Sequence, residues 1–383
     1  MGPLSGVKIL EIAAIGPAPM ASMLLAELGA TVLRLDRPTA SDLGLAIPVE
    51  KELLLRSRPA ISVDLKSDAG IKFALDLVAS ADMLIEGFRP GVMERLGLGP
   101  EICLKRNSKL IYGRMTGWGQ TGPLAHTAGH DLNYIALSGA LDSIGRTGAP
   151  PTPPLNLVGD FGGGALYLTL GLLAALTFAR STGQGQVVDA AMVDGAASLM
   201  TLFYGLRAAN LFNFPRGKNI LDSGAPYYDV YQCADGGYIA VAAIEMKFRR
   251  ELLEKLGLYG SVPDGEDPDT WPALRAAIEK VVRSKSREEW STIFDGSDAC
   301  VSPVLSMAEV HRHPHNLHRK TFVDVEGIVQ PAPAPRFSVT ALGLPTRPTP
   351  VDSDVAAALA PWGLSDAAVD RLMASRVIGL TTR

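Results

Sequence analysis

Cysteine is scarce in this chain, and a long uninterrupted apolar run is missing. The three cysteines, Cys103, Cys233 and Cys300, are an odd number at wide spacing, which excludes both a disulfide framework and a CxxC metal site. We therefore expect a reducing, cytoplasmic location. No stretch reaches the roughly 18 consecutive apolar residues of a membrane span, and neither end carries a secretory or peroxisomal signal, so we expect no membrane partner.

An excess of charge of one sign is also missing, because 36 basic residues face 40 acidic ones, for a net charge of −4. This balance excludes the broad basic surface of a nucleic-acid-binding protein and leaves phosphate binding to local arginines. What the chain has is length and apolar content: 383 residues, 47% of them hydrophobic, with a mean hydropathy of +0.17. These values predict a well-packed globular enzyme with two domains, or one domain with a large excursion.

Strand and helix patterns alternate through the first third of the chain. Strand-like runs lie at Val7–Ala13, Thr31–Leu35, Ala60–Leu65, Met83–Phe88 and Leu110–Met115. Helical patterns lie between them at Met20–Leu28, Asp68–Ala79 and Gly91–Leu98. This alternation predicts an α/β fold with a doubly wound parallel sheet and right-handed crossovers.

Two features of this region imitate a dinucleotide-binding site. Asp36 ends the second strand, where an acidic residue could bind a ribose, but the first turn, IGPAPMAS, lacks the glycine fingerprint. The segment Gly117–Gly122 fits GxGxxG, yet Pro123 and LAHTAGH follow it in place of the helix whose amides would face a phosphate. We therefore expect no nicotinamide or flavin.

Arginines gather at strand ends and in the loops that follow them. Because the carboxyl edge of an open α/β sheet is where ligands bind, and because guanidinium groups suit phosphate oxygens, this pattern favours a polyphosphate ligand over solvated surface charge. The six residues are Arg34, Arg37, Arg56, Arg58, Arg89 and Arg95.

The stretch from Gly117 to Asp160 is polar and rich in glycine and proline, which is typical of loops at a cleft. It carries His130 and Asp160. The run after Asp160, FGGGALYLTLGLLAALTFAR, predicts a long buried helix with Asp160 among its first residues, where aspartate is also a common N-cap. The glycines Gly162–Gly164 indicate that a ligand approaches this backbone closely.

The second half begins with QVVDAAMVDG, a predicted strand that passes into a helix at Ala196–Asn210. A β-hairpin with Asp235-Gly236 as its turn then leads to Glu245. Helical patterns follow at Met246–Leu256, Asp269–Arg283, Arg287–Phe294 and, as short helices, within Ala356–Thr382. The segment HRHPHNLHR lacks two ligands on one helical face with an acidic partner, so we expect no metal there.

Several segments together resemble the family III CoA transferases, the CaiB/BaiF family. They are LSGVKILEIAAIGPAPMASMLLAELGATVLRLDRP, RMTGWGQTGP, GHDLNY, LNLVGDFGGG, GQVVDAAMVDG, NILDSGAPYYDVY and IFDGSDACVSPVL. The match runs from end to end, and it is strongest for the members that racemise 2-methylacyl-CoA thioesters. The resemblance implies a Rossmann-like large domain built from both chain ends, a smaller α+β domain, and a homodimer of two interlocked subunits.

On this basis we divide the chain into five parts. Residues 1–185 are the first part of the large, CoA-binding α/β domain, and residues 336–383 are the C-terminal return to it. Residues 226–310 form the small α+β domain, and residues 186–225 and 311–335 are the two linkers.

The resemblance also implies the site residues. The catalytic residues would be His130 of GHDLNY, Asp160 of VGDFGGG, and Glu245 of AAIE as the hydrogen-bond partner of His130; His126 lies outside the motif. The residues implied to contact CoA or substrate are Arg37, Val63, Asp64, Leu65, Lys66, Arg89, Arg95, Gly129, Asp131, Leu132, Asn133 and Tyr134.

These residue types suit racemisation. Inverting a carbon next to a thioester requires one base to remove a proton from one face and a second group to return one to the other face. His130 and Asp160 would serve the two faces, and amides at the start of the Gly162–Gly164 helix would stabilise the enolate oxygen. The reaction needs no metal and no cofactor, since CoA is part of the substrate.

Two alternatives stay open on the sequence. The first is transfer of CoA between carboxylic acids, in which the aspartate at the Asp131 position would act as nucleophile. The second is a non-catalytic CoA-ester-binding protein, which would keep the arginines but have no use for two bases. The sequence does not name the acyl chain beyond the 2-methyl branch that the resemblance implies.

Overall fold

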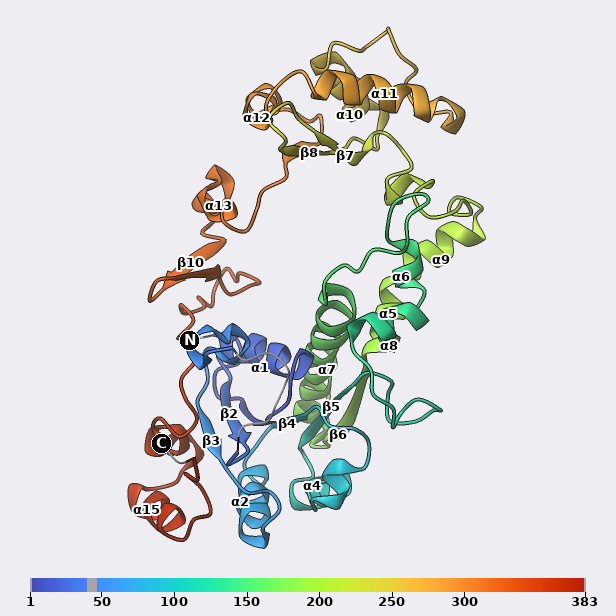
Figure 1. The fold of residues 1–383 in the computed structure, drawn as a ribbon. Helices are drawn as coiled ribbons and strands as arrows, with labels where there is room; N and C mark the ends of the chain where they lie inside the picture. Colours follow the sequence, from blue (N-terminus) through green and yellow to red (C-terminus); the bar gives the residue numbers. More distant parts are fainter. Residues whose placement is uncertain (1, 40–46, 382–383) are drawn as a thin grey trace. The chain divides into compact units, whose positions relative to one another are not determined.

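The computed structural model describes residues 2–39 and 47–381, and the chain divides into two compact units (Figure 1). The first unit comprises Met1–Ser138, Leu155–Leu199 and Arg319–Arg383, so both ends of the chain belong to it. The second unit comprises Gly139–Pro154 and Met200–His318. Each unit has a hydrophobic core of its own.

The first unit is built on a six-stranded sheet with the strand order β3-β2-β1-β4-β5-β6. All neighbouring pairs are parallel, which confirms the predicted doubly wound sheet. One predicted strand is shorter than expected, because the Asp64 carboxylate accepts the Lys66 amide and turns the chain after Ser62. The strands are β1 (Lys8–Ile12), β2 (Thr31–Asp36), β3 (Ala60–Ser62), β4 (Met83–Glu86), β5 (Ile111–Thr116) and β6 (Gln186–Ala191).

Helices cover both faces of this sheet (Figure 1). Side chains of β1 alternate between the faces: Ile9 packs with α1 and α7, and Leu10 packs with α2, α4, α14 and α15. These helices are α1 (Pro17–Glu27), α2 (Asp68–Val78), α4 (Pro100–Arg106), α7 (Leu166–Thr182), α14 (Val355–Leu359) and α15 (Asp366–Ala374).

The long helix predicted around and after Asp160 begins earlier and is less buried than expected. It starts as a π-helix, η3 (Leu157–Ala165), and continues as α7. By length and composition alone the combined helix is long and apolar enough to cross a membrane. Length and composition are weak evidence for a membrane span, and Leu168 and Leu172 of this helix pack into the core beside the sheet. Its other face leaves Leu166 and Leu170 52% and 64% exposed in the single chain, so the predicted buried helix is buried along one face.

The helix predicted at Ala196–Asn210 is two helices. The first, α8 (Met192–Leu199), starts directly after β6, and the second, α9 (Thr201–Ala208), follows Met200. Helix α8 belongs to the first unit and α9 to the second. The first unit also contains the short elements η1 (Val49–Lys51), η2 (Leu53–Leu55), α3 (Val92–Arg95), α5 (Asp131–Leu137), β10 (Phe322–Val325), β11 (Ile328–Pro331) and η7 (Ala360–Trp362).

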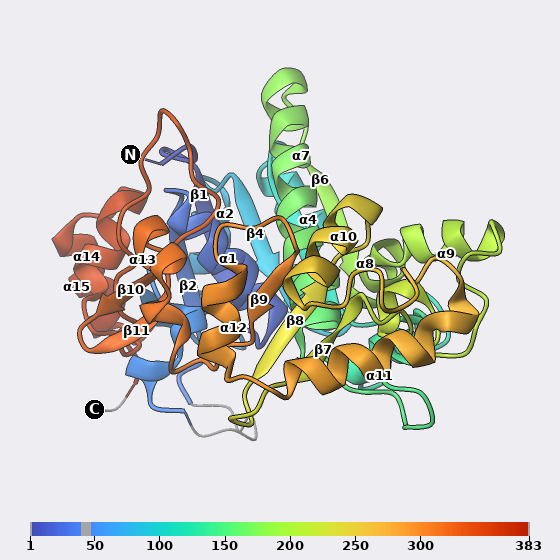
Figure 2. The same ribbon diagram turned by 90° about the horizontal axis from the view of Figure 1, so that it is seen from above.

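The second unit has a three-stranded antiparallel sheet and three longer helices (Figure 2). Side chains of the sheet and of these helices form one hydrophobic core. The predicted hairpin is present, with Gly236 at a φ of 82° in its turn. The sheet and its helices are β7 (Tyr228–Gln232), β8 (Tyr238–Ala242), β9 (Val301–Pro303), α10 (Met246–Lys255), α11 (Trp271–Val282) and α12 (Arg287–Phe294). The shorter elements are α6 (Ala140–Ser143), η4 (Ile220–Asp222), η5 (Pro268–Thr270), η6 (Val310–Arg312) and α13 (Pro314–Arg319), the last ending at the boundary of the unit.

Candidate active site

Two cavities lie at the edge of the first unit's sheet where the parallel strands end. The His130 cavity, of about 300 Å³, is lined by the loops after β1, β4 and β5 together with His130 and Asp160. The arginine cavity, of about 950 Å³, is lined by residues at the ends of β1, β2 and β3 and by the segment after β4. Phe88 and Arg89 line both cavities, so the two adjoin at this pair of residues.

A tight aromatic cluster fixes the backbone before His130. The ring of Tyr134 packs edge-on against Trp118, with ring centroids 4.8 Å apart, and its hydroxyl donates to the carbonyl of Gly129. A Cβ atom at Gly117 would stand 2.1 Å from the Tyr134 ring, so only glycine fits there. Burial raises the pKa of Tyr134 to about 12, which keeps the phenol protonated as a donor.

His130 lies at the N-cap of α5 in extended backbone conformation. Its amide donates to Oδ1 of Asn133 at 3.1 Å, and the Asn133 amide donates to the His130 carbonyl at 2.8 Å. Asn133 therefore holds the backbone of His130 in place. The exposed imidazole of His130 lines the cavity. His126 does not line it, in agreement with its position outside the motif.

Asp160 lies in the first turn of η3, half-buried, with its carboxylate at the same cavity. Desolvation is the main cause that raises its pKa above the ordinary range. The hydrogen bond from Asn156 and the charge of His130 lower it, and the negative charge of Asp131 raises it further. Sequence reasoning missed Asn156, whose Nδ2 donates to Oδ2 of Asp160 at 3.1 Å; its spacing of four residues before Asp160 was the available signal.

The glycines after Asp160 have a packing role that the sequence interpretation did not foresee. A Cβ atom at Gly163 would stand 2.5 Å from the amide nitrogen of Ala196 on α8, and one at Gly164 would stand 2.9 Å from Met192. The close approach of two helices therefore explains these glycines. Two of the first amides of η3 are also occupied, because Gly159 and Asp160 both donate to Asp131, so these two are not available to an enolate oxygen.

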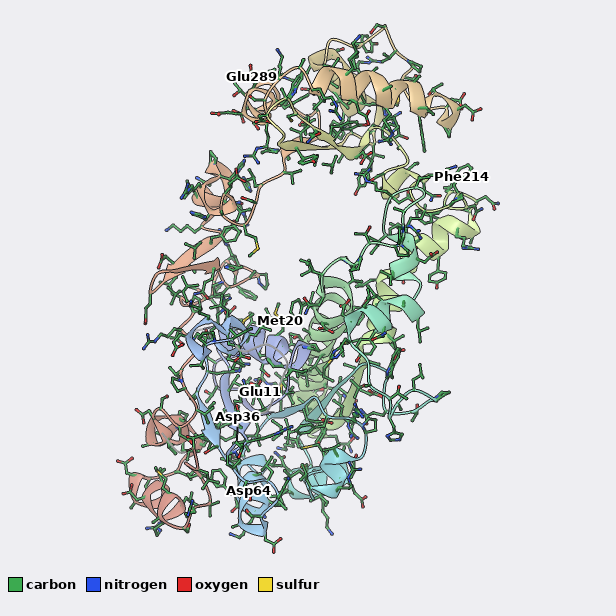
Figure 3. All side chains as sticks on the ribbon, in the orientation of Figure 1. Glu11, Met20, Asp36, Asp64, Phe214 and Glu289 are labelled. Atoms are coloured by element: carbon green, nitrogen blue, oxygen red, sulfur yellow. The ribbon has the colours of Figure 1, made fainter. Side chains whose placement is uncertain are left out.

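The arginine cavity contains every cation that the family resemblance assigned to CoA. Arg37, Lys66, Arg89 and Arg95 line it, as do Val63–Leu65. Two carboxylates are also present, those of Asp36 and Asp64, which are labelled in Figure 3. The guanidinium of Arg37 lies 5.7 Å from the centre of the Phe88 ring. Four cations against two carboxylates give this cavity a net positive charge that suits phosphate groups.

The other three arginines at the strand ends do not line this cavity, so their prediction as phosphate ligands is wrong. Each is buried in an ion pair within the first unit. The pairs are Arg34 with Asp36 at 3.0 Å, Arg56 with Glu27 at 2.5 Å, and Arg58 with Glu11 at 2.5 Å. Glu11 and Glu27 lie far from their partners in sequence, which is why the local pattern gave no sign of the pairing.

The remaining predicted site residues fall in three places. Gly129 and Tyr134 line the His130 cavity, whereas Asp131, Leu132 and Asn133 line neither cavity. Glu245 belongs to the second unit, where it is exposed at the N-cap of α10. The structure thus brings His130 and Asp160 together in one unit and leaves Glu245 in the other.

The GxGxxG segment and the histidine-rich segment both have ordinary structural explanations. Within Gly117–Gly122, Gly119 and Gly122 take positive φ angles in an irregular loop, with no helix directly after them. The histidines of HRHPHNLHR lie on and around η6 and α13, and no group of three or more potential metal ligands is found within residues 2–39 and 47–381.

Comparison with known proteins matches this arrangement to one family. The model of CoA-transferase family III matches residues 4–352. The chain is 42% identical to alpha-methylacyl-CoA racemase of Mus musculus over 98% of this chain and 97% of that one, and 44% identical to the Homo sapiens racemase over 87% and 86%. A crystal structure of a CaiB/BaiF family protein from Brucella suis superimposes with a TM-score of 0.79 at 26% identity, covering 94% of this chain and 99% of the other. The chain therefore belongs to CoA-transferase family III, the CaiB/BaiF family.

Proposed function

We propose that this protein interconverts the (2R) and (2S) epimers of 2-methylacyl-CoA thioesters by proton transfer through an enolate. The observation that carries the proposal is that His130 and Asp160, from two different elements, line one small cavity that adjoins a larger, positively charged one. The high identity to two proteins named alpha-methylacyl-CoA racemase supports it.

His130 and Asp160 act as the two proton-transfer groups. In one direction the imidazole removes the proton from carbon 2 and the protonated Asp160 returns one to the opposite face; in the other direction the roles reverse. The raised pKa of Asp160, caused mainly by desolvation, increases the fraction of protonated carboxyl that can act as acid near neutral pH. Each turnover moves one proton off and one proton on, so the enzyme needs no metal, nicotinamide or flavin.

The arginine cavity binds the CoA part of the substrate. Arg37, Lys66, Arg89 and Arg95 carry the positive charge for its phosphates. Because Phe88 and Arg89 line both cavities, the pantetheine chain passes this pair and delivers the thioester to His130 and Asp160.

The buried position of Asp131 disfavours transfer of CoA between acids. A nucleophilic carboxylate must reach the thioester carbon, but Asp131 is outside the lining of the His130 cavity, and its Oδ2 accepts two backbone amides at 2.7 Å each. A protein that only bound CoA esters would have no use for the paired groups at the neighbouring cavity.

We further propose an interlocked homodimer in the cytoplasm, with residues 186–225 and 311–335 as the connecting segments. The apolar face of η3 and α7 supports a covered surface there, since Leu157, Leu166 and Leu170 are all more than half exposed in the single chain. In this arrangement Glu245 of one subunit orients His130 of the other. A stable and active monomer in solution would contradict the arrangement.

Solvent exchange tests the reaction directly. The purified protein, in deuterated buffer with a chelator and no added cofactor, should introduce deuterium at carbon 2 of a 2-methylacyl-CoA and interconvert its epimers. The same substrate without the 2-methyl branch, and the free acid, are the controls for substrate class. Product that forms only when a second carboxylic acid is added, with a hydroxylamine-trapped adduct on Asp131, would establish the transferase instead.

A further inference from the structure

Asp131 is a buried carboxylate next to the reacting groups that the proposed proton transfer does not use. The residue is 5% exposed and begins α5 directly after His130. Its Oδ2 accepts the amides of Gly159 and Asp160, both at 2.7 Å, and its Oδ1 is buried with no hydrogen-bond partner among the described residues. This one side chain therefore connects the backbone of His130 to the backbone of Asp160.

Gly159 is shaped to receive this carboxylate. A Cβ atom at Gly159 would stand 2.6 Å from Oδ2 of Asp131, so any other residue would push the carboxylate away from the two amides. The amides themselves belong to the start of η3, where backbone donors lack intrahelical partners and favour a negative charge. The glycine and the carboxylate thus form one matched contact between α5 and η3.

We propose that Asp131 is a positioning residue for the reaction: its carboxylate holds the Gly159 and Asp160 amides and so fixes where the Asp160 carboxylate stands relative to His130. This inference rests on the proposed racemase function and gives Asp131 a role other than the nucleophile of the transferases. A displacement of a reacting group by about 1 Å can lower the rate of a step on the order of 100-fold. A contact that fixes the position of Asp160 therefore has a large effect on the rate of proton transfer.

The negative charge of Asp131 also affects the pKa of Asp160, and this pKa can be measured without turnover. Burial is the main cause of the raised pKa of Asp160, and the negative charge of Asp131 adds to it, against the lowering effects of Asn156 and His130. The charged or titratable residues on the elements packed against η3 are His130, Asp131, Tyr134, Asp194, Glu27, Tyr167, Arg180, Tyr112, Arg114 and Asp189. Asp131 and His130 are the ones among them that shift the Asp160 pKa.

Three variants test the contact. Asp131→Ala removes both the acceptor and the charge, Asp131→Asn keeps an acceptor oxygen without the charge, and Gly159→Ala displaces the carboxylate from the other side. Asp354→Asn is the matched control, because its carboxylate accepts a helix-start amide, that of Ala357, far from either base. Deuterium exchange is measured from each epimer separately, and the Asp160 pKa is measured by carbon NMR of Cγ-labelled aspartate, with Asp160→Asn identifying the signal.

We expect Asp131→Ala and Gly159→Ala to lower exchange from one epimer by about 10–100-fold more than from the other, with the bias that Asp160→Asn shows. Asp131→Asn should lose less and should lower the pKa of Asp160, and Asp354→Asn should match the wild type. Equal losses from both epimers in folded Asp131→Ala, or an unchanged Asp160 pKa in Asp131→Asn, would overturn the proposal. If the wild type exchanges neither epimer, the racemase function fails, while the Asp160 titration still decides the role of Asp131.

Discussion

The two cavities of the first unit hold their charged groups in opposite ways. In the arginine cavity the cations Arg37, Lys66, Arg89 and Arg95 are exposed, and none of them is in an ion pair within the described parts of the chain. In the His130 cavity the surroundings of both reacting groups are fixed by short backbone contacts. These are the contacts of Tyr134 with Gly129, Asn133 with His130, and Asp131 with the two amides of η3.

The difference follows from what each cavity has to do. Attraction between cations and phosphates falls off slowly with distance and tolerates mobile side chains, whereas proton transfer requires atoms placed within hydrogen-bond reach. The same unit also shows a third use of charge, in which Arg56 and Arg58 are buried against Glu27 and Glu11 and serve the fold. An arginine at a strand end can therefore belong to either class, and its burial decides which.

The largest effect is expected from removal of the two reacting groups. His130→Ala and Asp160→Asn should each lower racemisation on the order of 100- to 10,000-fold, because each removes one general acid-base group. Exchange of hydrogen should be suppressed mainly from one epimer by His130→Ala and mainly from the other by Asp160→Asn. Separate deuterium-incorporation rates for purified (2R) and (2S) substrates measure this bias.

Two further variants serve as comparisons for the losses expected in His130→Ala and Asp160→Asn. His126→Ala should leave both rates close to those of the wild type, and Glu245→Gln should lower both by about 10–100-fold as an orienting partner would. Small and equal losses for both epimers in His130→Ala and Asp160→Asn enzymes that still fold and bind CoA esters would remove the two-base mechanism.

Next in size is the contrast between a buried and an exposed arginine. Arg58→Ala leaves Glu11 buried and unpaired, which should cost about 3–5 kcal/mol of unfolding free energy. Arg95→Ala removes an exposed cation and should leave stability close to wild type, but raise KM roughly tenfold with kcat little changed. Chemical denaturation and steady-state kinetics at low and high salt separate the two effects.

The dependence on salt concentration also distinguishes the exposed Arg95 from the buried Arg58. The loss of CoA-ester affinity in Arg95→Ala should shrink as ionic strength rises, because an exposed attraction is screened. A stability loss for Arg95→Ala as large as that of Arg58→Ala would show that the two arginines belong to one class after all.

The smallest effect is on the free energy of unfolding and concerns Glu86, which binds the backbone of Phe88, a residue that lines both cavities. Its buried carboxylate accepts the Phe88 amide at 2.7 Å and pairs with Arg114 at 3.0 Å, and burial raises its pKa from 4.5 to about 7. Because the folded state then binds more protons than the unfolded state, stability from this group falls as pH rises from about 5 through 7. Relative to the wild type, Glu86→Gln should gain up to roughly 3 kcal/mol of unfolding free energy between pH 5 and pH 8.

A neighbouring acid gives the matched control for Glu86. Glu94 shares Arg114. Burial is the largest single effect on its pKa and acts to raise it, but the hydrogen bond from Arg114, the backbone hydrogen bonds and the charge of Arg114 together lower the pKa. Its stabilising effect is present at neutral pH and is lost on acidification, so Glu94→Gln should be less stable than the wild type at pH 7, with the difference shrinking toward pH 4. Unfolding at a series of pH values that gives both variants the same trend would contradict the assignment for Glu86.

The sequence by itself determined the strands of the large sheet and their order along the chain. The alternation of strand-like runs with helical patterns between Val7 and Met115 predicted the parallel sheet and its crossovers, because strands that alternate with helices form βαβ units. Motif matching to the family selected His130 and Asp160 before any geometry was known, and the cavity they share agrees with that choice.

Only the tertiary structure decided which partner each charged or small residue meets. Whether an arginine binds phosphate or pairs with Glu11 depends on a residue 47 positions away, and whether Gly163 admits a ligand or a helix depends on α8. Asp131 is the sharpest case, since its contact with Gly159 and Asp160 spans 28 and 29 residues. Local patterns report the burial of a side chain, but long-range contacts form only once the sheet order has brought distant segments together, and for that reason no window of sequence contains them.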